Sequence, residues 1–102
     1  MADLPPAVET VVEYIASDAE LAGSQVARLF DAKDIENIDA IGKCSPDPIV
    51  YDEKREMAFA LFECRGELGH YGMAIQFSVE ANAVTRAAIM TINQIGGSDE
   101  NG

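Results

Sequence analysis

Basic residues are scarce in this chain, which has 7 lysines and arginines against 18 aspartates and glutamates in 102 residues, a formal net charge of −11. A surface this acidic repels nucleic-acid backbones and anionic lipid headgroups. We therefore expect no nucleic-acid binding and no polybasic docking to membranes. A basic protein is the partner that complements this charge.

Long apolar runs are absent as well. The longest uninterrupted run extends only from Met57 to Phe62, whereas a helix that crosses a bilayer needs roughly 20 apolar residues. We expect no membrane span. The first residues also lack the basic and apolar segments of a signal peptide. Two interpretations stay open here, a cytosolic protein or one whose signal peptide was removed.

The chain has two cysteines and one histidine, which are too few for most metal sites and most nucleophilic active sites. Cys44, Cys64 and His70, with Glu63 or Glu67, would supply four zinc ligands, but their spacing matches no compact zinc motif. Cys64 with His70 is the one pairing available for nucleophilic catalysis, and no flanking motif arranges it. We expect no metal, no cofactor and no enzymatic activity.

The first 41 residues carry helical patterns. Apolar residues recur at helical spacing from Val8 to Ile15 and predict a helix that begins at Pro6. Ser17 to Glu20 has the form of a capping box, which predicts a second helix to about Asp31. This second helix would bury apolar residues, namely Ala22, Val26, Leu29 and Phe30.

Two points in this region stay open. Gly23 weakens the second helix and allows one bent, continuous helix through both segments. The segment from Asp34 to Ile41 has isoleucines at every third position, which suits a helical turn, but its sequence could equally begin a strand.

The rest of the chain predicts strands. Lys43–Asp52 and Glu56–Arg65 flank a polar turn, and a hairpin centred on Lys54 pairs Tyr51 with Met57 and Ile49 with Phe59. A third strand, His70–Glu80, has the clearest alternation. A tight turn at Asn82-Ala83 leads to a fourth strand, Val84–Asn93. That turn places Met73 opposite Ile92 and Ile75 opposite Met90.

These registers predict two different faces of the sheet. The larger side chains form the face on which the helices pack: Ile49, Tyr51, Met57, Phe59, Leu61, Met73, Ile75, Phe77, Val79, Met90 and Ile92. The opposite face is smooth and moderately apolar, as at an interface for a second copy or another protein. Its residues are Val50, Ala58, Ala60, Phe62, Ala74, Gln76 and Ile89. The competing interpretation is that a helix or the Asp34–Ile41 segment covers this side.

The hairpin register also places Cys44 directly opposite Cys64. Two interpretations follow, a disulfide across the hairpin or two reduced, buried cysteines, with Pro46 and Pro48 able to introduce a bulge that breaks the register. A bridge would indicate a periplasmic or secreted protein, and free thiols a cytoplasmic one.

The predicted fold class is α+β, with one or two N-terminal helices packed on a four-stranded antiparallel meander. We expect a single domain over residues 1–95 and a disordered tail over residues 96–102. The order of elements resembles the cystatin-like architecture in outline. The Gln-x-Val-x-Gly loop of cystatins has no counterpart here, so the resemblance implies a fold and no function.

The functional hypothesis is a small, acidic, non-catalytic protein-binding domain, of the inhibitor or immunity type, that binds a basic protein. Two alternatives are a subunit of a larger assembly and a small-molecule-binding protein or enzyme. The latter needs an apolar cavity between helices and sheet, lined by Phe59, Leu61, Tyr71, Met73, Ile75 and Phe77. The carboxylates expected to contact a basic partner lie in the first third of the chain: Glu9, Glu13, Asp31, Asp34, Glu36 and Asp39.

Overall fold

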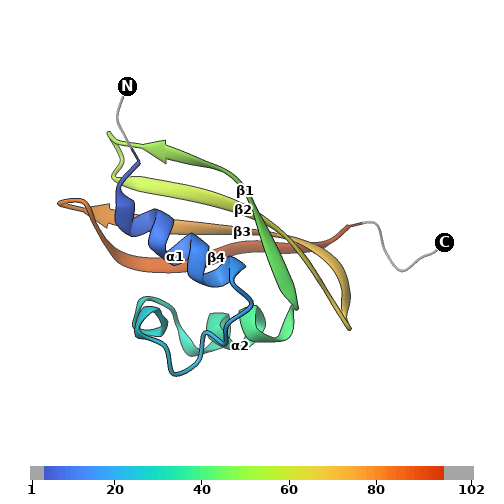
Figure 1. The fold of residues 1–102 in the computed structure, drawn as a ribbon. Helices are drawn as coiled ribbons and strands as arrows, with labels where there is room; N and C mark the ends of the chain where they lie inside the picture. The colour runs from blue at the N-terminus through green and yellow to red at the C-terminus, as the bar shows by residue number, and fades with distance from the viewer. Residues whose placement is uncertain (1–3, 96–102) are drawn as a thin grey trace.

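A computed structural model describes residues 4–95 and shows helices packed on one antiparallel sheet (Figure 1). The strands follow one another in the order β1-β2-β3-β4. The predicted α+β meander is therefore confirmed, whereas the tail predicted for residues 96–102 lies outside the described residues. The elements are α1 (Pro6–Ala16), the 3-10 helix η1 (Gln25–Leu29), α2 (Ala32–Ala40), β1 (Lys43–Asp52), β2 (Met57–Gly66), β3 (Gly69–Glu80) and β4 (Ala83–Gln94).

Helix α1 forms as its periodicity predicts. Pro6 starts it, because proline suits the first helical turn, where its missing N–H is not needed. The apolar stripe from Val8 to Ile15 is at most 6% exposed and belongs to the core. This stripe holds α1 against one face of the sheet, across β1 to β4 (Figure 1).

The predicted second helix is wrong. Asp18 and Gly23 have positive φ angles of 67° and 82°, which end any helix through this segment. The Ser17 hydroxyl donates to the Tyr14 carbonyl at 2.6 Å instead of capping a new helix. Only η1 is helical here, and Ala22, expected to be buried, is exposed.

The ambiguous segment after Asp34 is helical and forms α2. Ile38 and Ile41 are 6% and 3% exposed and join the same core as α1. The Ile89 N–H donates to an Asp34 carboxylate oxygen at 3.2 Å, which fixes α2 beside β4. Helix α2 therefore packs on the side of the sheet that α1 covers.

The β1–β2 hairpin has two registers. Near the turn Tyr51 pairs with Ala58 and Ile49 with Ala60, one residue away from the prediction. An irregularity between Pro46 and Ile49 then restores the predicted register, so that Cys44 does lie opposite Cys64. Proline has no N–H for a ladder, which explains why the irregularity falls on this edge strand.

The β3–β4 hairpin confirms Met73 opposite Ile92 but places Ile89, not Met90, opposite Ile75. Ala74 pairs with Thr91 just before this shift, so Met90 is the extra residue of a bulge. The tight turn lies one residue earlier than expected. It consists of Ala81 and Asn82, both at positive φ.

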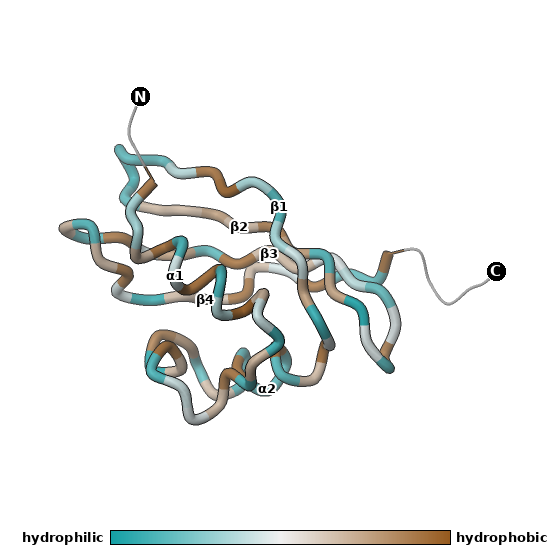
Figure 2. The backbone as a smooth tube through the Cα atoms, in the orientation of Figure 1, coloured by the Kyte–Doolittle hydropathy of each residue, from teal (hydrophilic) through white to brown (hydrophobic). Residues whose placement is uncertain are grey.

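The faces assigned to β2 are reversed. Ala58, Ala60 and Phe62 are at most 1% exposed and face the helices. Their neighbours Met57, Phe59 and Leu61 point to the opposite side, because successive strand residues alternate and a shift of one residue exchanges the faces. Ile89 is also on the helix side, paired with Ile75, whereas Val50, Ala74 and Gln76 stay on the outer side. Figure 2 shows β2 as pale to brown along most of its length, since both its faces are apolar.

Candidate functional site

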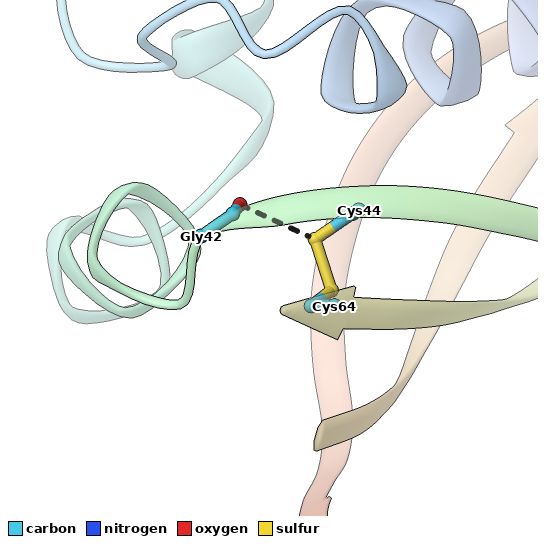
Figure 3. Close-up of a disulfide and its surroundings, with 3 residues drawn as sticks. All are labelled: Gly42, Cys44 and Cys64. Carbon is cyan, nitrogen blue, oxygen red and sulfur yellow. Dashed lines mark hydrogen bonds between the residues drawn. A yellow bond between two sulfur atoms is a disulfide. The ribbon is translucent and has the colours of Figure 1, made fainter. Parts of the chain in front are cut away.

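Cys44 and Cys64 form a disulfide between the ends of β1 and β2 that lie next to α2 (Figure 3). The S–S distance is 2.08 Å, and the two residues are 2% and 0% exposed. The Cys44 Sγ also lies 3.8 Å from the Gly42 carbonyl oxygen (Figure 3), a packing contact, because a disulfide sulfur has no proton to donate. Of the two interpretations left open for Cys44 and Cys64, the structure shows the disulfide.

The disulfide removes the thiolates that the zinc and nucleophile hypotheses require. His70 Nε2 lies 3.4 Å from a Glu63 carboxylate oxygen but makes no hydrogen bond of good geometry. Within residues 4–95 no group of three or more His, Cys, Asp or Glu side chains could hold a metal ion.

Three of the six carboxylates expected to contact a partner instead bind this chain. Asp39 accepts hydrogen bonds from the Leu21 and Ala22 N–H groups at 2.7 and 3.0 Å, and so holds the loop after α1. Asp34 binds β4 as described above. Asp31, 65% exposed, pairs with Arg86 at 3.1 Å. These three residues join α2 and the residue before it to the loop after α1 and to β4.

Glu9 and Glu13 lie elsewhere, on the rim of a groove between α1 and the edge strand β1. Asp47, a residue that the charge pattern did not indicate, is the third acidic residue of this groove, and it also borders a depression on the outer side of the sheet beside Leu61. We call this depression the acidic groove. Its volume is about 330 Å³, and its remaining lining is apolar: Leu4, Val12, Pro46, Pro48 and Ile49. Glu36 is exposed on α2 and is not part of the lining.

Local sequence explains how these three side chains reach the groove. Glu9 and Glu13 are four residues apart, so they lie on the same side of α1. Asp47 stands between two prolines in the irregular part of β1, where no regular ladder forms. A charged residue flanked by prolines on an edge strand was the signal that could have identified it.

The groove carboxylates have no counter-ion within the described part of the chain. No hydrogen bond or ion pair joins Glu9, Glu13 or Asp47 to another side chain of residues 4–95. Like charges at this helical spacing repel each other. A cation bound in the groove would relieve that repulsion.

The outer side of the sheet is a second candidate surface. We call it the outer face and define it by residues that pair across the strands and point away from the helices. Its centre consists of two rows, Val50-Phe59-Gln76-Ala88 and Leu61-Ala74-Thr91. Val50 and Leu61 are 62% and 53% exposed. The expected apolar outer surface therefore exists, but with larger side chains from β2 than predicted.

The residues expected to line a ligand cavity do not lie around one space in residues 4–95. Met73, Ile75 and Phe77 are at most 1% exposed and pack in the core with α1. Phe59 and Leu61 point to the outer face, so the six predicted residues do not line one space. The acidic groove, at about 330 Å³, is at the lower end of the roughly 300–1,000 Å³ typical of small-molecule pockets.

The geometry defines an α+β domain with a helical layer on one face of a four-stranded meander. No family model, no curated protein and no solved structure matches the chain. The cystatin-like outline therefore stays a prediction from the sequence. None of the helices in residues 4–95 is long and apolar enough to cross a membrane.

Proposed function

We propose that this chain is a small, non-catalytic protein-binding domain, of the inhibitor or immunity type, that holds a basic segment of another protein in the acidic groove. The observation that carries the proposal is the acidic groove itself. Its lining combines three acidic residues with apolar ones, and the three carboxylates lack a counter-ion within residues 4–95.

The lining suits an arginine or a lysine side chain. The aliphatic stem of either residue packs on apolar surface while its charged head reaches a carboxylate. Val12, Pro48 and Ile49 supply the apolar surface, and Glu9 and Glu13 accept from the head group. Arginine is the better fit, since its planar fork can bind two oxygens at once.

Strand addition is a less suitable mode of binding at this edge. A partner strand would need N–H and C=O groups in register along β1, and Pro46 and Pro48 have no N–H. Side-chain recognition in the groove therefore gives the specificity. The net charge of −11 raises the association rate with a basic partner and makes that rate fall with added salt.

The disulfide supports a location outside the reducing cytosol. Structural disulfides persist in the periplasm and in secreted proteins, whereas cytosolic thiols are kept reduced. A periplasmic or secreted place of action is therefore part of the proposal. Alkylation of denatured protein without reductant would label both Cys44 and Cys64 if this part were wrong.

A pull-down from the native host tests the proposal. Three tagged baits are compared: the wild type, a groove variant Glu9→Gln/Glu13→Gln/Asp47→Asn, and a control Glu53→Gln/Glu67→Gln/Glu80→Gln. The control residues are exposed and make no side-chain hydrogen bond or ion pair within residues 4–95. Both variants lose the same amount of negative charge.

We expect one basic protein on the wild type and the control, released by salt, and at least tenfold less of it on the groove variant. Equal loss on both variants would show that net charge, not the groove, governs binding. Equal retention on all three baits, or turnover of a small molecule with no bound protein, would overturn the proposal.

A further inference from the structure

The outer face carries little charge at its centre, where Asp47 borders the depression lined by Leu61, Ala74 and Thr91. The two central rows contain only apolar and neutral polar side chains, from Val50 on β1 to Ala88 and Thr91 on β4. A sheet with one face in water normally carries polar or charged side chains there. This chain has 25% charged residues, so the absence of charge from seven neighbouring outer positions requires an explanation.

The few charges on the outer face border its two central rows and balance each other. Asp52 and Arg86 stand on the two edge strands of one end row, which Met57 and Ser78 complete, and Glu63 lies toward the other end. Asp47 lies between these ends, beside Leu61. Lys43 and Arg65 pair with each other in the last row. Three acidic residues (Asp47, Asp52 and Glu63) and three basic residues (Lys43, Arg65 and Arg86) leave the outer face neutral, although the whole chain has a net charge of −11. The negative charge that would repel a second copy is therefore located elsewhere.

The size of the outer face is adequate for a dimer. Four strands spaced about 4.8 Å apart and ten residues long at about 3.4 Å each give a projected area of about 650 Å². Two such faces in contact bury about 1,300 Å² in projection. Specific interfaces bury about 1,200–2,000 Å² in total, so full overlap of the two faces reaches this range.

The other occupants fit this face less well. A basic protein would find no excess of carboxylates there, unlike at the acidic groove. The residues that follow Ile95 in the sequence, Gly96 to Gly102, include no apolar side chain with which to cover it. Helix α2 packs on the opposite side, as its buried Ile38 shows.

We propose that the outer face binds a second copy of this chain and forms a two-fold symmetric dimer with the two sheets packed face to face. In such an interface the same patch meets itself, so Phe59 and Leu61 of each copy contribute to one apolar layer between sheets about 10 Å apart. Glu9 and Glu13 of the acidic groove lie on α1 and stay accessible, whereas Asp47 borders both surfaces. The proposal does not depend on the proposed function.

Light scattering during size-exclusion chromatography of the whole protein, loaded at about 100 µM, tests this inference. The chain mass is 11.0 kDa, and we expect a species of twice that mass. Leu61→Glu is the test variant and Leu68→Glu its control, since these leucines are 53% and 60% exposed and only Leu61 is in the central rows. Glutamate at either position leaves the core intact.

We expect Leu61→Glu to be monomeric, with the dimer dissociation constant raised at least 100-fold, and Leu68→Glu to remain dimeric. Val50→Glu provides a second test on another strand if Leu61→Glu fails to fold by circular dichroism. A monomeric wild type, or unchanged dimers in the outer-face variants that fold, would overturn the inference. A variant confined to α1, Glu9→Gln/Glu13→Gln, should stay dimeric, which separates this result from the proposed function, because Asp47 borders both surfaces.

Discussion

Reduction of the Cys44–Cys64 disulfide should destabilise the fold by a calculable amount. The bridge closes a loop between residues 20 positions apart. In the chain-entropy model a loop of this length removes about 11 cal/mol/K of entropy from the unfolded chain, or about 3 kcal/mol at 25 °C. Both cysteines are buried under the helices. After reduction their thiols stay out of contact with water in the folded state, so hydration does not offset the lost stabilisation.

The expected change is large enough for a thermal assay. A chain of 102 residues has an unfolding entropy of about 0.2 kcal/mol/K, so a loss of 3 kcal/mol lowers the Tm by about 15 °C. Circular dichroism on oxidised and fully reduced protein, with the thiols counted by alkylation and mass spectrometry, gives both quantities. A Cys44→Ala/Cys64→Ala variant is the control, because reductant should not change its Tm.

A shift of less than about 3 °C after complete reduction would refute the reasoning. It would mean that the strand pairs next to Cys44 and Cys64 already hold the ends of β1 and β2 together in the unfolded ensemble. Two labelled cysteines in the unreduced protein would contradict the bridge itself.

Further predictions concern folding, each measured by urea denaturation. Gly42→Ala should lower the free energy of unfolding by at least ~3 kcal/mol. Gly42 has a φ of +104°, and a Cβ added there would collide with the backbone of Arg65. Asp39→Ala should cost about 1–2 kcal/mol by removing two acceptors from backbone amides of the loop after α1. Phe62→Ala should lower the free energy of unfolding by about 3–5 kcal/mol. At protein concentrations low enough to dissociate the proposed dimer, Leu61→Ala should lower it by less than about 1 kcal/mol, since Leu61 is 53% exposed in the single chain. Similar losses for Phe62 and Leu61 would contradict the assignment of faces in β2.

The sequence predicted those elements whose apolar pattern has one interpretation. Helix α1 followed from the spacing of Val8 to Ile15, and β3 from the alternation of Met73, Ile75 and Phe77. The position of Cys44 opposite Cys64 followed from register arithmetic. Near the turn the register differs from the predicted one by one residue. The irregularity between Pro46 and Ile49 cancels this difference, so the prediction is correct at the cysteines.

The second helix could not be excluded from its local sequence. Ser17 to Glu20 has a favourable helix-start pattern, but the loop is held by Asp39, which is 18 residues away from Leu21. A contact of this range outweighs the local preference of a short segment. Its existence is visible only in three dimensions.

The two faces of β2 were not distinguishable because both are apolar. Large side chains were expected under the helices, but Ala58 and Ala60 lie there instead. Their partners Phe77 and Ile75 fill the space that the alanines leave, since a close-packed core is set by total volume and not by the size of each side chain. Charge patterning found Glu9 and Glu13 for the groove and missed Asp47.

Photo-crosslinking in the native host tests the central claim, that the acidic groove holds the partner, most directly. A photoreactive phenylalanine analogue at position 48 reports on the groove, because Pro48 lines it and is exposed. The same analogue at position 68 is the control, since Leu68 is 60% exposed in the β2–β3 turn. The account predicts an adduct with a basic protein from position 48 that salt suppresses, and none from position 68. Adducts from position 68 alone would contradict it.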